Sequence, residues 1–454
     1  MRVLQRSAAR HLSPARKRGG RYATKHRLLV LSDQAVSSLS NVLVTILVAS
    51  TANRQTFGVF ALTLVAYQLA LGAIRSVATE PLLSLYADHG PRSRRGIVAD
   101  IHGTTLFVGA ACSLLTFAVA ALLDPGPQAA FLALALVLPL VLVQDTWRYL
   151  LVIDRPGAAL AIDVVWLLVL VPALTLVPSG SEAGTYVLAW GLTGALGAVT
   201  GTALGWGLPG WPHPWKWLVR HGAMSWRYFM EFVTAQGVGQ LGFAGLAAIS
   251  GAAALGAARA AWVVFGVLVV VHSGLYMILV PEGVRERSDP GRLRRKFLGA
   301  SAASIGVSAA WMVTSLLVPS SIGTRLFGDT WDKAEQLLVP MGVVMIAGSA
   351  LSGALLGIRA LSDPGRSLRA RLASAPFQAV CPLVGAVLGD ATGFVLGLAA
   401  GNAVSAVIWW TSFLRATAGD APADDRSPVP QPAAGSSPGT DAGAPVDAGI
   451  AASA

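Results

Sequence analysis

The chain has 454 residues, of which 54% are hydrophobic and only 13% are charged, about half the charged share of an average soluble domain. Its formal net charge is +11, yet 29 of the 34 Lys and Arg residues lie in the two tails and the even-numbered connections between predicted spans, against four in the odd-numbered connections. This positive-inside asymmetry excludes nucleic-acid binding as the reason for the charge, and it predicts that both termini are cytoplasmic.

Twelve apolar stretches follow one another along the chain, each long enough to cross the hydrocarbon of a bilayer. We expect spans at 28–50, 57–83, 97–123, 129–150, 158–177, 184–207, 228–250, 257–280, 297–318, 334–357, 370–389 and 391–414. The predicted fold class is therefore an all-α polytopic membrane protein with about 12 transmembrane helices.

The second six spans repeat features of the first six about 200 residues later. Ser37 and Asn41 in span 1 correspond to Gln236 and Gln240 in span 7, both at an offset of 199. Because six is an even number, both halves enter the membrane in the same orientation, which predicts two parallel-repeat six-helix lobes around a central cavity. The expected division is a basic cytoplasmic tail at 1–27, an N-terminal lobe at 28–207, a linker at 208–227, a C-terminal lobe at 228–414 and a disordered cytoplasmic tail at 415–454.

The linker and the tails have distinct compositions. Four tryptophans lie in 208–227 beside basic residues, which predicts an amphipathic segment at the cytoplasmic interface. The first 27 residues contain nine Lys or Arg residues, and the last forty are mainly Ala, Pro, Gly, Ser and Asp. The C-terminal tail has hardly any large apolar residues, so we expect it to be disordered.

Two common enzyme motifs are absent from the sequence. It contains no G-x-x-x-x-G-K-[ST] phosphate loop and no H-E-x-x-H. Cys112 and Cys381 both lie inside predicted spans, so they give no disulfide framework or metal spacing. We therefore expect a transporter that is not an enzyme, that has no cofactor or metal and that has no ATPase of its own.

Polar residues share faces in both halves. Asp33, Ser37 and Asn41 lie on one face of span 1, and Gln236 and Gln240 lie on one face of span 7. One interpretation is a cavity wall that hydrogen-bonds sugar hydroxyls. The other is helix–helix contact, for which membrane proteins use the same residue types.

Arg75 and His272 lie inside predicted spans. Arginine within a span often faces a substrate pathway, and Arg75 is suited to a diphosphate, which a guanidinium binds at two points. The alternatives are that its side chain reaches the cytoplasmic interface or pairs with Glu80. His272 is either a proton carrier or a hydrogen-bonded packing residue.

Four acidic residues, Asp33, Asp100, Asp163 and Glu231, lie where odd-numbered spans are expected to begin. Their carboxylates would complement helix dipoles there.

Asp145 and Arg148 lie three residues apart at the exit of span 4, and Arg359 lies at the corresponding exit of span 10. We interpret these charges as a cytoplasmic gate that breaks and re-forms during transport.

Several short runs resemble one known family. The runs 31–38 (LSDQAVSS) and 57–60 (FGVF) resemble the first hairpin of bacterial polysaccharide (O-antigen type) flippases. The run 144–149 (QDTWRY) resembles the fourth-helix exit of actinobacterial members, and 280–282 and 328–331 are also similar. These flippases belong to the multidrug/oligosaccharidyl-lipid/polysaccharide exporter superfamily, and the resemblance covers about residues 28–414.

The resemblance implies a V-shaped transporter with a central, often cationic cavity. It would flip a polyprenyl-diphosphate-linked oligosaccharide across the bacterial cytoplasmic membrane by alternating access, for cell-surface polysaccharide synthesis. Family members often have several cations in the cavity, whereas Arg75 is the one clear cation within a span here, with Arg259 at the outer start of span 8 as a supplement. Membrane lipids and a polysaccharide polymerase or glycosyltransferase are the other expected partners.

Two other functions stay open. The first is a cation-coupled small-molecule (multidrug) exporter of the same superfamily, which would be favoured by a coupling carboxylate deep in one lobe. The acidic residues are expected near the cytoplasmic ends, which argues against it. The second is a non-transporting scaffold for cell-envelope synthesis.

Overall fold

The computed structural model describes residues 14–82, 91–205, 213–361 and 363–418, and this part of the chain is helical with no β-strand. The first half forms α1 (Pro14–Thr51), α2 (Arg54–Ile74), the π-helical turn η1 (Arg75–Thr79), α4 (Pro91–Ala120), α5 (Pro125–Asp154), α6 (Pro156–Thr175) and α7 (Ala183–Leu204). The connecting and second-half helices are α8 (Pro214–Phe232), the π-helical turn η2 (Val233–Gly237), α9 (Val238–Ser250), α10 (Ala252–Val264), α11 (Gly266–Arg285), α12 (Pro290–Leu316), α13 (Ser320–Phe327), the 3₁₀ turn η3 (Gly328–Thr330), α14 (Trp331–Gln336), α15 (Leu338–Ala360) and α16 (Pro364–Ala418).

The predicted class, an all-α polytopic membrane protein, is confirmed. Within the described ranges, nine helices are long and apolar enough to cross a membrane. The first six predicted spans correspond one to one to α1, α2 with η1, α4, α5, α6 and α7. Spans 11 and 12 are covered by α16, which bends sharply at Gly389 and Asp390.

Span 8 was wrong as a single helix, whereas span 7 ends at residue 250 as predicted. α9 ends at Ser250 and is followed by Gly251, whose φ of 86° is a conformation that glycine adopts without steric cost. α10 therefore begins at Ala252, five residues before the predicted start of span 8, and it is separated from α11 at Phe265. An apolar run does not reveal such breaks, because all these segments are similarly hydrophobic.

Helix starts follow local sequence signals. Asn53 caps α2 through its side chain, which accepts a hydrogen bond from the Thr56 N–H at 2.8 Å. Proline lacks the N–H that the first helical turn leaves unpaired, so it suits this position. It opens several helices, at Pro125, Pro156, Pro214, Pro290 and Pro364.

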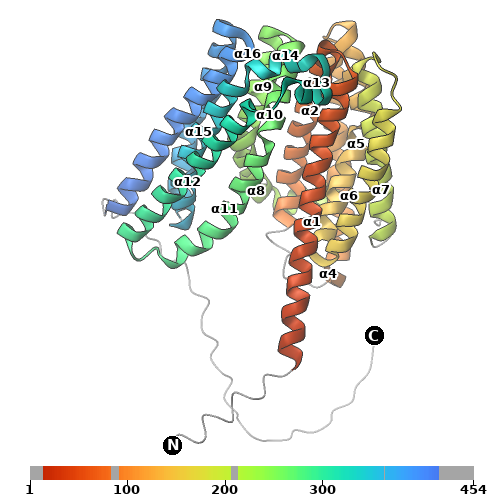
Figure 1. Cartoon of the computed structure of the whole chain (residues 1–454). Helices are drawn as coiled ribbons and strands as arrows, with labels where there is room; N and C mark the ends of the chain where they lie inside the picture. The colour runs from red at the N-terminus through yellow and green to blue at the C-terminus, as the bar shows by residue number, and fades with distance from the viewer. Residues whose placement is uncertain (1–13, 83–90, 206–212, 362, 419–454) are drawn as a thin grey trace, which may run out of the picture.

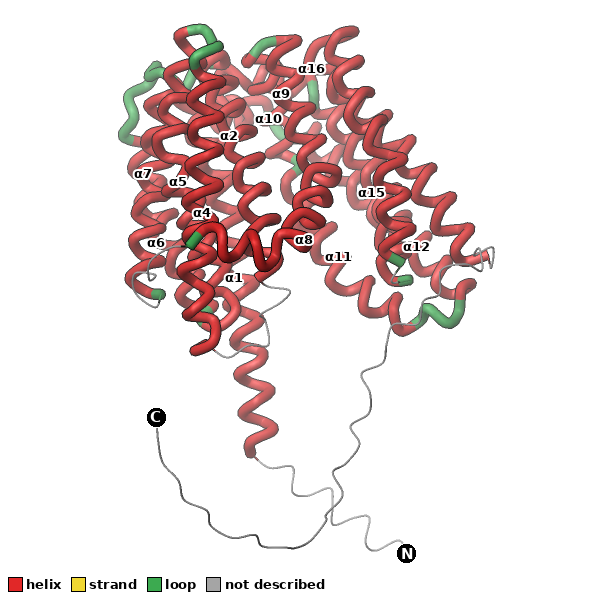
Figure 2. Tube along the Cα trace, turned by 180° about the vertical axis from the view of Figure 1, so that it is seen from behind, coloured by secondary structure: helices red, strands yellow, loops and turns green. Residues whose placement is uncertain are grey.

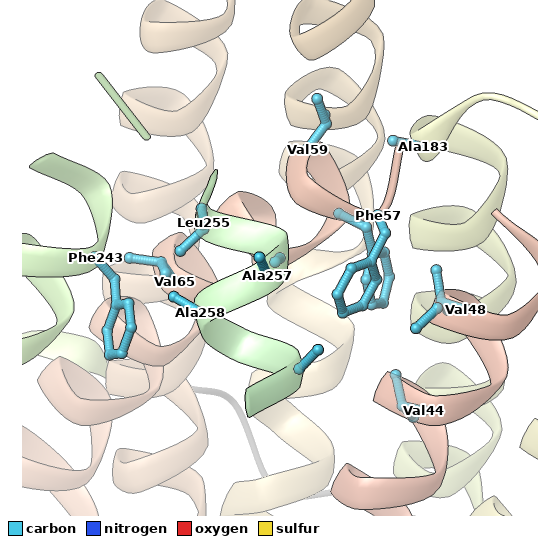
Figure 3. Packing of buried hydrophobic residues seen from close by; sticks show 14 of the residues in the cluster. Val44, Val48, Phe57, Val59, Val65, Ala183, Phe243, Leu255, Ala257 and Ala258 are labelled. Carbon is cyan, nitrogen blue, oxygen red and sulfur yellow. The ribbon is translucent and has the colours of Figure 1, made fainter. Parts of the chain in front are cut away.

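The helices form two lobes (Figure 1), an N-lobe of α1–α7 and a C-lobe of α9–α16. We call the end where α1 meets α2 the apex and the end where α5 meets α6 the base. At the apex α2 packs on α10 so closely that a Cβ at Gly58 would overlap the carbonyl of Ala252. Figure 3 shows the apolar contact on both sides of this junction, with Phe57 and Leu255 among its residues. One buried cluster therefore spans both lobes.

A second contact strengthens the apex. The guanidinium of Arg54, at the start of α2, donates to the Asp329 carbonyl oxygen of η3 at 2.6 and 3.2 Å. Toward the base the lobes diverge (Figure 1). The structure is therefore joined at the apex and parted at the base.

The predicted amphipathic linker is part of α8, which crosses between the lobes (Figure 2). α8 packs on α4 and η1 of the N-lobe and continues through η2 into α9 of the C-lobe. Trp215, Val219 and Trp226 are exposed on one face, whereas Trp217 is buried. Residues 206–212 of the linker lie outside the described residues, as do 1–13 and 419–454 of the predicted tails; residues 14–27 belong to α1.

Candidate functional site

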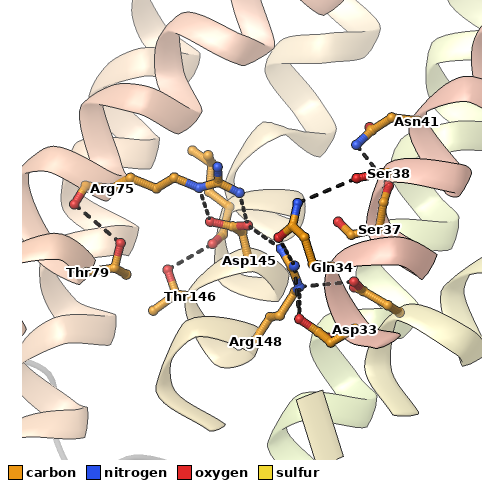
Figure 4. Close-up of polar contacts among 12 residues, drawn as sticks. Asp33, Gln34, Ser37, Ser38, Asn41, Arg75, Thr79, Asp145, Thr146 and Arg148 are labelled. Carbon is orange, nitrogen blue, oxygen red and sulfur yellow. Dashed lines mark hydrogen bonds and ion pairs between the residues drawn. The ribbon is translucent and has the colours of Figure 1, made fainter. Parts of the chain in front are cut away.

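Five charged residues gather inside the N-lobe, and we call them the N-lobe charge cluster: Asp33, Arg75, Asp145, Arg148 and Asp163. Figure 4 shows all of them but Asp163 with labels. Arg75, at the start of η1, forms a two-point ion pair with Asp145 of α5. Its Nε donates to Oδ2 at 2.9 Å and its Nη2 donates to Oδ1 at 2.6 Å. The guanidinium also lies 4.9 Å from the ring centre of Tyr149. The predicted alternative partner, Glu80, is not its ion-pair partner among the described residues.

Arg148 joins three helices at the centre of the cluster. Its Nε donates to Asp33 Oδ2 of α1 at 3.1 Å, and the same nitrogen lies 3.0 Å from Asp163 Oδ2 of α6. Its Nη1 is 3.9 Å from Asp145 Oδ1, a looser contact. Arg148 therefore balances several carboxylates at once, and its loss would leave buried charge without compensation.

The cluster has more carboxylates than guanidiniums. Asp33 and Asp163 are 3% and 1% exposed, respectively, so both are cut off from bulk water. Asp33 Oδ1 and Asp163 Oδ2 accept no aligned hydrogen bond from the described residues. With all five groups ionised, three carboxylates face two guanidiniums, which leaves one excess negative charge in a buried site.

A cavity of about 160 Å³ adjoins the cluster within the N-lobe. Ser37 and Asn41 of α1 line it, together with Tyr67 and Trp190, whose rings meet edge to face at 4.8 Å. Polar groups dominate the lining. The cavity can hold a few water molecules or a small ion rather than a sugar chain.

A second, larger space lies between the lobes, and we call it the inter-lobe cavity. It has a volume of about 360 Å³. Its cationic lining consists of Arg75 from the N-lobe and Arg359 and Arg371 from the C-lobe. Glu80 and Glu231 also line it, so its charged groups sum to one positive charge when all are ionised.

Both π-helical turns border the inter-lobe cavity. Arg75 opens η1, and Gln236 lies in η2. Between these turns Phe232 packs so closely against Gly72 that a Cβ there would overlap its ring. Single π-helical turns are rare and occur frequently at functional sites.

The remaining candidates lie within the C-lobe. Arg259 Nη2 donates to Gln240 Oε1 at 2.7 Å, and the guanidinium lies 4.1 Å from the Phe243 ring centre. His272 Nδ1 is 2.7 Å from the Leu268 carbonyl oxygen, and its Nε2 is 3.0 Å from Ser349 Oγ. His272 therefore has the contacts of the predicted hydrogen-bonded packing residue.

Two interpretations from the sequence need correction. Gln236 and Gln240 do not share a cavity wall, because Gln236 lines the inter-lobe cavity while Gln240 binds Arg259 inside the C-lobe. Asp33 and Asp163 do not open their helices, since α1 begins at Pro14 and α6 at Pro156. Asp100 likewise lies well inside α4, and Glu231 lies next to the last residue of α8, far from its first turn. Dipole complementarity falls off within the first turn, so it does not explain these residues.

The gate residues are arranged differently from a simple pair. Both Asp145 oxygens are engaged by Arg75 within the N-lobe, and Arg359 lines the cavity between the lobes. A gate that involves these charges stays a prediction.

Sequence reasoning missed Arg371, Glu231 and Tyr228 as cavity residues. Arg371 was counted with the connection after span 10, and Tyr228 and Glu231 lie near the linker boundary. One signal in the sequence could have identified Arg371. Arg359 and Arg371 lie on either side of one short connection, and a short connection places the two helices side by side.

No family model and no curated protein matches the chain. Among solved structures, it is similar to an inward-facing multidrug resistance MATE family transporter of the MOP superfamily, with a TM-score of 0.67 and 11% identity over 86% of this chain and 98% of that one. It is also similar to the lipid II flippase MurJ in an inward closed conformation, with a TM-score of 0.64 and 9% identity over 86% and 90% of the two chains. An outward-facing MATE transporter gives a TM-score of 0.55 with 12% identity over 86% and 94%. The chain thus has the fold of MOP-superfamily transporters.

Proposed function

We propose that this protein flips a polyprenyl-diphosphate-linked oligosaccharide from the cytoplasmic to the outer leaflet of the bacterial cytoplasmic membrane by alternating access. The observation that supports this function is the inter-lobe cavity, to which the N-lobe contributes Arg75 and the C-lobe contributes Arg359 and Arg371. Guanidinium groups bind phosphate oxygens at two points, so cations from both lobes suit a diphosphate head.

The arrangement of the lobes supports an amphiphilic substrate. A sugar head needs polar surroundings while it crosses the hydrocarbon, because burying unpaired hydroxyls is costly. A prenyl chain needs lipid. Lobes that part at the base offer a polar space between them and lipid at their sides. The distribution of Lys and Arg supports a cytoplasmic base.

The proposed reaction order implies two kinds of partner. Glycosyltransferases would assemble the lipid-linked glycan on the cytoplasmic side, and a polysaccharide polymerase would consume it outside. Consumption outside would draw net transport outward. Such a driving force is needed because the sequence has no phosphate loop with which to use ATP.

The test is leaflet-resolved labelling of a polyprenyl-diphosphate oligosaccharide in proteoliposomes. We expect protein-dependent movement of the glycan, and about a tenfold or larger loss in Arg371→Gln, since a hydrogen bond to a charged group contributes about 1.5–3 kcal/mol. Arg369→Gln is the matched control, because Arg369 is exposed and does not line the cavity. Equal rates in the two variants would contradict a role for the cavity in binding the head group.

A cation-coupled small-molecule exporter is the second candidate, and the N-lobe charge cluster favours it. A proton or a monovalent cation would balance the excess negative charge at Asp33 and Asp163. These carboxylates lie inside one lobe rather than at helix ends, which removes the argument made against this function from the sequence. Efflux of an organic cation driven by a proton or sodium gradient, lost in Asp163→Asn but kept in Asp100→Asn, would support it.

A further inference from the structure

The π-helical turn η1 contains a carbonyl group whose usual α-helical donor is missing. In an α-helix the carbonyl of Val77 would accept the N–H of residue 81, but residue 81 is proline and has no N–H. The proline ring also presses against the carbonyl four residues before it. The widened turn η1 ends two residues before Pro81, at Thr79. The Val77 carbonyl therefore lacks the N–H that an α-helix would supply from position 81.

Two side chains of α8 provide that donor. Trp217 Nε1 donates to the Val77 carbonyl oxygen at 2.9 Å, and Ser225 Oγ donates to the same oxygen at 2.7 Å. Trp217 and Ser225 are 2% and 3% exposed, so both hydrogen bonds are shielded from water. The two residues are eight positions apart, about two helical turns, and so share one face of α8.

The turn held in this way begins with Arg75. The Glu80 N–H bonds to the Arg75 carbonyl, and Thr79 Oγ1 donates to the same oxygen at 3.3 Å. The Arg75 side chain reaches Asp145 and also lines the inter-lobe cavity. A change in the backbone of η1 therefore changes the position of the Arg75 guanidinium.

We propose that Trp217 and Ser225 are positioning residues for Arg75, acting through the Val77 carbonyl in place of the N–H that Pro81 lacks. Because α8 continues through η2 into α9, the same two bonds connect the C-lobe to the turn that carries Arg75. Movement of the C-lobe is thereby transmitted to a cation of the N-lobe. The inference rests on the proposed function only in what Arg75 binds.

The test compares Trp217→Phe/Ser225→Ala in the natural sequence and in a Pro81→Ala background, using the full chain. Pro81→Ala returns an N–H at position 81, which makes the donors from α8 dispensable. Two quantities are measured: hydrogen exchange of the amides at 76–80, and binding of inorganic pyrophosphate. With Pro81 present, the double variant loses both hydrogen bonds to the Val77 carbonyl. We therefore expect its amides at 76–80 to exchange about tenfold faster than those of the wild type, and its affinity for pyrophosphate to fall by a similar factor. In the Pro81→Ala background we expect the same two substitutions to change amide exchange and pyrophosphate affinity only slightly, compared with Pro81→Ala alone.

Equal effects in both backgrounds would overturn the proposal, since they would show that α8 acts by packing alone. Unchanged exchange in the natural background would also overturn it. If the double variant does not fold, the single variants are compared in the same two backgrounds. If wild type and Arg75→Gln bind pyrophosphate equally, the proposed function fails, whereas the exchange measurement still decides the positioning role.

Discussion

Arg75 of the π-helical turn η1 and Asp145 of α5 form a two-point ion pair, with nitrogen–oxygen distances of 2.9 and 2.6 Å. The Asp145 side chain is 9% exposed and that of Arg75 is 30% exposed, so the pair lies at the boundary between the N-lobe interior and the inter-lobe cavity. The same cation that stabilises the lobe is therefore available to an anionic ligand.

This pair should be worth a measurable coupling energy. We expect Asp145→Asn to lower the free energy of unfolding by about 1–3 kcal/mol, because the pair is only partly shielded from water. A double-mutant cycle with Arg75→Gln should give a coupling energy within the same range. Thermal unfolding in detergent measures it. Additive effects of the two substitutions would contradict a direct interaction.

Neutralising Asp163 should have a smaller effect than neutralising Asp145. Asp163 Oδ2 accepts no aligned hydrogen bond, and the cluster has one more carboxylate than guanidinium. Asp163→Asn removes the excess charge and keeps the volume, so we expect it to change the unfolding free energy by less than about 1 kcal/mol. Arg148→Gln, by contrast, should destabilise by about 3 kcal/mol or more, because it leaves three carboxylates close together. A larger loss of stability in Asp163→Asn than in Arg148→Gln would show that the cluster does not have an excess negative charge.

The apex contact should be sensitive to a single methyl group. A Cβ at Gly58 would overlap the Ala252 carbonyl, so Gly58→Ala must push α2 away from α10. We expect the distance between spin labels at Ser50 and Ser320, both exposed near the apex, to increase in this variant. Gly239→Ala is the matched control, because nothing lies within 4 Å of a Cβ there. An unchanged distance would contradict the close packing at the apex.

A surface ion pair near the base should give a defined pH dependence. Glu282, at the end of α11, lies 2.8 Å from Lys296 Nζ, and this hydrogen bond and charge lower the pKa of Glu282 below its usual value. A lowered folded-state pKa stabilises the fold above the unfolded pKa, and this contribution is lost as the pH falls through the folded value. The difference in melting temperature between wild type and Glu282→Gln should therefore be small at pH 7 and disappear below about pH 4. Glu182→Gln, at an exposed site, should show no such difference at either pH.

Much of the fold could be predicted from the length of the apolar runs. This signal located α4 to α7 because each is bounded by proline, glycine or a charged connection. It could not locate the break at Phe265, since that residue lies within continuous apolar sequence. Whether a helix breaks there depends on how α10 and α11 pack.

The site was predicted only in its components. Arg75, Asp145 and Arg148 were recognised as unusual charges, but their partners depend on how α2 and α5 face each other. Asp33 was misinterpreted because the first membrane span is shorter than the helix that contains it, so the position where α1 begins was misjudged. Arg371 was overlooked because a cation at the edge of a span has the same sequence signal whether it faces a cavity or a headgroup.

The two candidate functions can be separated in one preparation. Proteoliposomes of the wild-type protein are assayed for leaflet-resolved movement of a polyprenyl-diphosphate oligosaccharide and, in parallel, for gradient-driven efflux of an organic cation. The account predicts glycan movement that Arg371→Gln slows about tenfold or more and that Arg369→Gln preserves. Cation efflux that Asp163→Asn abolishes, with no glycan movement by the folded protein, would contradict it.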